Sequence, residues 1–172
     1  KEYLATLRLG VETETLDTEG AVTNRCPVGH ITAARLDECL KGIQGPQMQV
    51  PAAYSALKHK GRPLYYYARK GIEIAKEPRQ VCISEIERSD GGGDLAGDTA
   101  EFGFRVVCSK GTYIRTLAAD IGKALGCRAY LRQLRRTRSG CFSVDDSISW
   151  PELQGPDAYR RCVGSMLSVE QV

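Results

Sequence analysis

Two stretches of the chain combine residue types that bind nucleic acids. Residues 58–70 contain five basic side chains and three consecutive tyrosines but no acidic residue, and residues 128–138 contain five arginines, again without an acid. Basic side chains bind phosphates and aromatic rings stack on bases, so both stretches favour an RNA-binding surface. A solvated helix face beside a basic edge strand is the alternative, and these residues alone leave it open. The cations are Lys58, Lys60, Arg62, Arg69 and Lys70 in the first stretch and Arg128, Arg132, Arg135, Arg136 and Arg138 in the second.

A third candidate is Ser109-Lys110-Gly111-Thr112, which lies where an expected strand turns into an expected helix. Free backbone N–H groups at such a turn, together with Lys110, can hold a phosphate. Small polar residues at strand–helix turns also serve as scaffolding, so the pattern leaves both roles open.

The composition bounds the class of protein without identifying a reaction. The 172 residues, 42% hydrophobic and 26% charged, suffice for one globular domain, and the net charge of +3 is uninformative. No apolar run approaches the roughly 20 residues of a membrane span. The seven cysteines are odd in number and widely spaced, and the only histidines are His30 and His59. We therefore expect no metal site, no disulfide framework and a cytoplasmic or organelle-matrix location.

The hydrophobic pattern predicts the elements that must position these residues. Strict alternation indicates strands over residues 3–9 and 101–108, with 81–88 and 132–144 also extended. Thr32 is expected to cap a helix that ends at Gly45-Pro46, and Gly126 to close a helix that follows residue 113. A short helix is expected from Pro63 to Gly71 and one more after Trp150-Pro151, with loops over 10–20, 24–30 and 89–98. The pattern predicts an α+β fold, in which a largely antiparallel sheet packs against flanking helices.

Three motifs in this order resemble the TruB-type tRNA pseudouridine synthase family. They are Tyr54-Ser55-Ala56-Leu57-Lys58 with Gly61, Leu64, Tyr65, Ala68, Arg69 and Gly71 after it, then Cys108 to Arg115, then Leu134-Arg135-Arg136. The resemblance covers residues 1 to about 153. It implies the catalytic domain of that family over 1–153 and a tail over 154–172 without a separate RNA-binding module.

The resemblance implies isomerisation of a T-loop uridine (position 55 in tRNA by family analogy) to pseudouridine, without metal or cofactor. By analogy, Tyr54 stacks on the target uracil and Arg135 pairs with the catalytic carboxylate. Lys58 and Leu153 are the further expected substrate contacts. The expected RNA contacts are Lys60, Arg62, Arg69, Lys70, Lys110, Arg132 and Arg136. Gln133 departs from the family pattern, in which some members carry a tyrosine, so no stacking role is expected there.

The family's Gly-x-Leu-Asp-Pro-x-Ala-Thr-Gly loop, which carries the catalytic aspartate, is absent from the sequence. Leu16-Asp17 resembles it superficially but lacks the following motif, so Asp17 is rejected as the nucleophile. We expect this chain to be inactive alone and to bind a separate N-terminal segment of the same domain, opposite a buried Arg135 at an unpaired sheet edge. The alternative is a non-catalytic RNA-binding or RNA-chaperone protein on the same fold.

Overall fold

The computed structural model describes residues 1–89 and 100–168, and most of the expected 89–98 loop lies outside these residues. Its main element is a six-stranded sheet in the order β10-β9-β1-β8-β7-β4. Every pair of neighbouring strands is antiparallel. The strands are β1 (Glu2–Leu9), β4 (Gly45–Gln49), β7 (Arg79–Arg88), β8 (Glu101–Cys108), β9 (Ala129–Ser139) and β10 (Phe142–Ser143). The predicted α+β class is confirmed.

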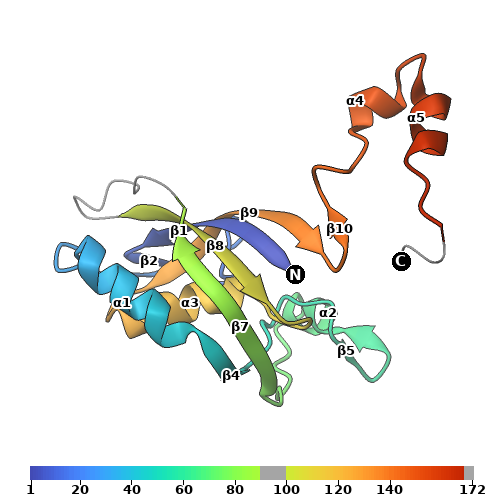
Figure 1. The fold of residues 1–172 in the computed structure, drawn as a ribbon. Helices are drawn as coiled ribbons and strands as arrows, with labels where there is room; N and C mark the ends of the chain where they lie inside the picture. The colour runs from blue at the N-terminus through green and yellow to red at the C-terminus, as the bar shows by residue number, and fades with distance from the viewer. Residues whose placement is uncertain (90–99, 169–172) are drawn as a thin grey trace.

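Two helices, α1 (Ala33–Ile43) and α3 (Ile114–Ala124), pack against one face of this sheet (Figure 1). Alternation places one set of side chains on that face and buries it, as expected for a half-covered strand. These residues are Tyr3, Ala5, Leu7 and Leu9 of β1 and Phe102, Phe104, Val106 and Cys108 of β8. Leu117, Ile121 and Leu125 cover them from the α3 side.

The helix ends follow the predicted signals. The Thr32 side chain accepts a hydrogen bond from the Arg35 N–H at the start of α1. Gly126 takes a positive φ of 76° directly after α3, a conformation that glycine adopts without strain. Gly122 lets α3 approach β9, because a Cβ there would lie 2.7 Å from the Cβ of Ala129.

Several local expectations were wrong. Part of the expected 10–20 connection is a strand, β2 (Val11–Thr13), which pairs with β3 (Val22–Arg25) and buries Val11 and Thr13. The short helix α2 (Leu64–Ala68) ends before Arg69 and Lys70, and Pro63 is its N-cap rather than its first residue. The tail forms two short helices, α4 (Trp150–Leu153) and α5 (Ala158–Gly164), instead of one. They stand apart from the sheet (Figure 1).

A two-stranded hairpin precedes α2. It joins β5 (Lys58–His59) to β6 (Arg62–Pro63) through Lys60 and Gly61, whose φ values are 46° and 80°. Two consecutive positive φ values belong to the type I′ turn that matches the twist of a hairpin. The turn therefore projects Lys60 into solvent at its tip.

Candidate functional site

The Tyr54 segment is joined to α2 by backbone hydrogen bonds. The N–H of Tyr65 donates to the carbonyl of Ser55 at 3.1 Å, and the N–H of Leu64 donates to that of Leu57 at 2.8 Å. Ser55 is buried while Tyr54 is half-buried. The motif and the helix that follows it therefore form one local unit, which presents the Tyr54 ring at the surface.

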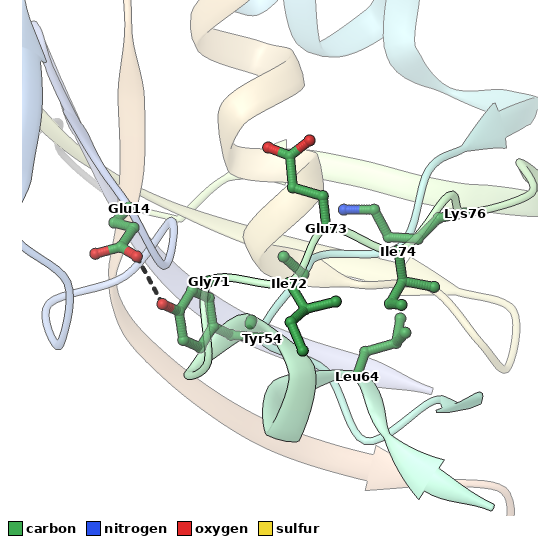
Figure 2. A pocket seen from close by; sticks show the side chains of 10 residues that line it. Glu14, Tyr54, Leu64, Gly71, Ile72, Glu73, Ile74 and Lys76 are labelled. Carbon is green, nitrogen blue, oxygen red and sulfur yellow. Dashed lines mark hydrogen bonds between the residues drawn. The ribbon is translucent and has the colours of Figure 1, made fainter. Parts of the chain in front are cut away.

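The Tyr54 hydroxyl donates a hydrogen bond of 2.6 Å to Oε1 of Glu14 (Figure 2). This bond raises the pKa of Tyr54 above its ordinary value, because the negative carboxylate stabilises the protonated phenol. A pocket of about 440 Å³ lies beside the ring, and its lining includes Leu64, Ile72, Glu73, Ile74 and Lys76. Such a mixture of apolar and charged lining suits a planar polar group such as a base.

Arg115, the last residue of the second motif, fixes the Tyr54 segment by hydrogen bonds. Its Nη1 donates to Oδ2 of Asp17 at 2.7 Å, and its Nη2 donates to the carbonyl oxygen of Tyr54. The other oxygen of Asp17 accepts hydrogen bonds from the Thr15 hydroxyl and the Glu19 N–H. Both carboxylate oxygens of Asp17 therefore accept hydrogen bonds, one from its own loop and the other from Arg115, and Asp17 thereby positions Arg115.

A second pocket, of about 500 Å³, adjoins the first because Glu14 and Tyr54 line both. Asp17, Arg69 and Arg115 also line it, so its wall is strongly charged. The structure therefore brings Tyr54 and Arg69 to one place, together with three residues for which the sequence reasoning assigned no site role: Glu14, Asp17 and Arg115.

The arginine strand β9 is open to solvent along Arg132–Arg136. Its outer edge pairs with β10 only at Arg138 and Ser139 within the described residues. Arg135 is exposed there, so the expectation that it is buried was wrong. The reason is that no described element covers β9 at this point, and Leu134 beside it is also 48% exposed.

The cross-strand register shows what adjoins the paired arginines. Arg135 lies opposite Leu4, and Arg136 lies opposite Tyr3, which is 9% exposed. Arg132 pairs with Glu101, which raises the pKa of its guanidinium and occupies part of its hydrogen-bonding capacity. Tyr3 is thus a second tyrosine placed next to the arginine strand, and no site role was expected for it from the sequence.

The turn from Ser109 to Thr112 is internally hydrogen-bonded. The Ser109 hydroxyl accepts from the Cys82 N–H at 3.0 Å, and the Thr112 hydroxyl donates to the Ser109 carbonyl at 3.0 Å. The buried side chain of Gln49 bonds both the N–H and the carbonyl of Tyr113. These contacts fasten the start of α3 to β4 and β7, which favours the scaffolding role, while Lys110 remains exposed.

The remaining predicted residues are spread over the surface. Lys58 and Lys60 are exposed on the hairpin, and Arg62 and Lys70 lie over the ring of Tyr66. Leu153 is on α4, which stands away from α2 in Figure 1, so it is not gathered with Tyr54. Within residues 1–89 and 100–168, no group of three or more His, Cys, Asp or Glu side chains is arranged to hold a metal ion. None of the helices in the described ranges is long and apolar enough to cross a membrane.

Two family models together match residues 1–166 of the chain. Residues 1–114 match the model of the TruB family pseudouridylate synthase N-terminal domain. Residues 115–166 match the tRNA pseudouridylate synthase B C-terminal domain.

Curated relatives agree with the family models. A protein of Desulfotalea psychrophila named tRNA pseudouridine synthase B is 57% identical over 172 residues, which is all of this chain and 70% of the relative. A protein of the same name from Nitrosococcus oceani is 48% identical over 90% of this chain and 48% of its own length. Another from Aromatoleum aromaticum is 45% identical over 99% of this chain and 53% of its own length. The chain thus spans about half the length of the latter two.

Solved structures share the fold at lower identity. A Cbf5-Nop10-Gar1 complex contains a chain with a TM-score of 0.60 and 24% identity, which covers 99% of this chain and 42% of that one. An H/ACA RNP bound to a substrate RNA containing 2′-deoxyuridine gives a TM-score of 0.55 at 22% identity, over 94% of this chain and 38% of that one. These solved structures show a shared fold only. The two family models together match residues 1–166, and this chain therefore belongs to the TruB family of pseudouridylate synthases.

Proposed function

We propose that this chain supplies the substrate pocket and RNA surface of an enzyme that isomerises the T-loop uridine of tRNA to pseudouridine. The observation that carries this proposal is the 57% identity, over the whole chain, to a relative named tRNA pseudouridine synthase B. The arrangement around Tyr54 supports it, because Arg115 and Glu14 hold an aromatic ring beside two adjoining pockets. A uridine extruded from its stack needs such an aromatic face to recover its lost stacking energy.

In this proposal Tyr54 contacts the target base, Arg135 orients the catalytic carboxylate, and the basic residues around α2 and β9 bind the RNA backbone. Lys58 and Leu153 are further substrate contacts on the same proposal. Residues 1–153 act as part of the catalytic domain, with 154–172 as a tail.

We place the catalytic aspartate on a segment of the gene product outside residues 1–172. Two carboxylates that line the pockets beside Tyr54 support this placement, because Glu14 is bonded to the Tyr54 hydroxyl and Asp17 to Arg115. The exposed Arg135 on an open stretch of β9 offers that segment a guanidinium and unpaired backbone groups.

The test compares residues 1–172 with the complete gene product. The substrate is a tRNA transcript whose uridines carry tritium at carbon 5, since isomerisation releases that hydrogen to water. We expect release by the complete product and none by residues 1–172 alone. Release by the isolated chain would place the catalytic acid within it. No release by either would favour the alternative function, a non-catalytic RNA-binding or RNA-chaperone protein.

A second test concerns the state of the folded chain. We expect a folded sample cut from the complete gene product to retain a second, non-covalently bound polypeptide that carries the catalytic aspartate. Native mass spectrometry detects such a complex directly. A stable monomer of 18.9 kDa with no companion would show that the fold closes without the segment.

A further inference from the structure

One tyrosine of the basic surface, Tyr66 on α2, is in contact with two cations. The guanidinium carbon of Arg62 lies over its ring, 4.4 Å from the centroid, and Nζ of Lys70 lies 4.5 Å from the same centroid. Lys70 also donates a hydrogen bond of 2.8 Å to the Tyr66 hydroxyl. Tyr67 supports the ring edge-on, with centroids 5.4 Å apart. The Tyr66 ring therefore contacts both Arg62 from the hairpin and Lys70 from the segment after α2.

These two cations differ from three arginines of the sheet. Arg105, Arg132 and Arg138 are each paired with a carboxylate. Within the described residues, neither Arg62 nor Lys70 has a carboxylate at ion-pair distance. Both cations keep free N–H donors, since a guanidinium has five and an ammonium has three. The Tyr66 ring that holds them is neutral, so both side chains keep their positive charge for binding an anion.

Two long side chains normally lose considerable conformational entropy when they bind a ligand together. The Tyr66 ring lowers that loss by holding both cations in place beforehand. Its pKa is below the ordinary value because of the Lys70 hydrogen bond, which agrees with a close approach of positive charge. The ring also has two cations over it, so its part is to hold cations and not to stack on a base.

We propose that Tyr66 is a positioning residue that organises Arg62 and Lys70 into a two-point clamp for the phosphate backbone of RNA. The proposal rests on the proposed function, which makes RNA the substrate, and it adds a residue that the expected RNA contacts did not include. The clamp consists of Arg62 on the hairpin and Lys70 in the segment that follows α2.

The test measures binding of a fluorescently labelled tRNA transcript to the complete gene product as a function of salt. Each phosphate contact contributes about 0.7 to 0.9 to the slope of log affinity against log salt. Tyr66→Leu removes both the ring and the hydroxyl. We expect it to weaken binding roughly three- to tenfold at moderate salt and to reduce the slope by about one contact. Tyr66→Phe keeps the ring over Arg62 and loses only the Lys70 hydrogen bond, so we expect an intermediate loss.

Tyr159→Leu is the matched control, because this tyrosine is 83% exposed and belongs to α5, which stands far from α2 in Figure 1. It should leave both affinity and slope unchanged. Thermal unfolding of each variant confirms that the fold is retained, and Tyr66→Phe provides the conservative variant if Tyr66→Leu unfolds.

A double-mutant comparison separates positioning from direct contact with RNA. In a background of Arg62→Gln and Lys70→Gln, the further change Tyr66→Leu should cost nothing more, because the ring acts through those two cations. A further loss in that background would overturn the proposal and assign Tyr66 a direct base contact. An unchanged slope for Tyr66→Leu, with wild-type binding intact, would also overturn it. Failure of the proposed function appears separately, as tRNA binding without pseudouridine formation.

Discussion

At the scale of single residues, two tyrosines of this surface sit in opposite electrostatic settings. The Glu14 carboxylate accepts a hydrogen bond from the Tyr54 hydroxyl and raises the pKa of Tyr54, whereas the Lys70 ammonium donates one to the Tyr66 hydroxyl and lowers the pKa of Tyr66. The same residue type therefore binds an acid at the pocket and cations on α2. In each case the largest cause of the pKa shift is a hydrogen bond to one neighbour, Glu14 or Lys70.

Replacing Tyr54 by phenylalanine tests its role in the complete enzyme. We expect turnover to fall by about a hundredfold or more, while affinity for tRNA stays within a few-fold, because the ring face is kept and the hydroxyl that family analogy links to proton transfer is lost. Single-turnover kinetics, with the enzyme in excess over tRNA and above the dissociation constant, measures the chemical step.

Tyr3→Phe is the informative comparison for that variant. Tyr3 adjoins Arg136 across β1 and β9, one position from the pair of Leu4 and Arg135. If Tyr54→Phe is nearly as fast as the wild type and Tyr3→Phe is slow, then the reactive tyrosine belongs to β1. Tyr54 would in that case serve only as part of the pocket wall.

The residues of the site were only partly predictable from the sequence. Local motifs identified Tyr54, and the pattern of charges identified the cations around α2. The contacts of Arg115 with Asp17 and with Tyr54 join residues 98 and 61 positions apart, and no periodicity encodes such partners. Asp17 was rejected as the nucleophile from the sequence, but its contact with Arg115 could be seen only in the structure.

At the scale of elements, the strands β1 and β8 and the helices α1 and α3 could be predicted because alternation and capping signals are local. The strand β2 was missed because three residues are too few to establish a period, although Val11 and Thr13 are both buried. One helix was expected in the tail, and two were found. Neither has buried residues, so the sequence contains no apolar stripe from which their bounds could be predicted.

The close approach of α3 to β9 predicts that alanine substitution at Gly122 destabilises the fold, whereas the same substitution at Gly42 in α1 does not. Gly122→Ala normally favours a helix, but its Cβ would lie 2.7 Å from the backbone nitrogen of Ala129 and must push the helix away. We expect a net loss of about 1–2 kcal/mol in the free energy of unfolding. Gly42→Ala in α1 is the control, since nothing lies within 4 Å of the added methyl, and it should stabilise by about 0.5–1 kcal/mol. Urea denaturation measures both, and equal effects would contradict the packing argument.

The contacts of Glu2 on β1 with the neighbouring strands predict how the stability of the fold depends on pH in the acid range. Glu2 accepts hydrogen bonds from Arg105 on β8 at 2.6 Å and from Thr137 on β9 at 2.9 Å, and these bonds lower its pKa below 4.5. The unfolded chain thus binds more protons between the two pKa values. The stabilisation is complete above pH 4.5 and is lost as the pH falls through the folded pKa.

Glu2→Gln should therefore cost about 1 kcal/mol or less at neutral pH, since the pair is partly solvated, and should cost nothing in strong acid. Denaturation at a series of pH values measures this difference. Glu85→Gln is the comparison, because Glu85 also pairs with Arg105 but is 58% exposed, and its effect should be smaller. A cost for Glu2→Gln that persists unchanged in strong acid would show that the charge is not its cause.

At the scale of the whole molecule, the two edges of the sheet differ. The edge strand β4 is five residues long, and its one large exposed hydrophobic side chain is that of Met48. At the other edge, β10 covers only the end of β9 and leaves Arg132–Arg136 open. Because Arg135 lies in water, its charge is solvated and does not carry the cost of an unpaired buried ion. The open edge can therefore persist in the folded chain without destabilising it.

Hydrogen exchange tests whether this edge is the docking place proposed for the outer segment. Backbone groups at an unpaired edge exchange rapidly, and pairing with another segment protects them. We expect peptides that cover β9 to exchange more slowly in the complete gene product than in residues 1–172, while peptides that cover β4 exchange equally in both. Exchange followed by mass spectrometry supplies this comparison directly. Equal exchange of β9 in both samples would place the catalytic segment elsewhere, and Arg135 would then lose its proposed part in orienting the carboxylate.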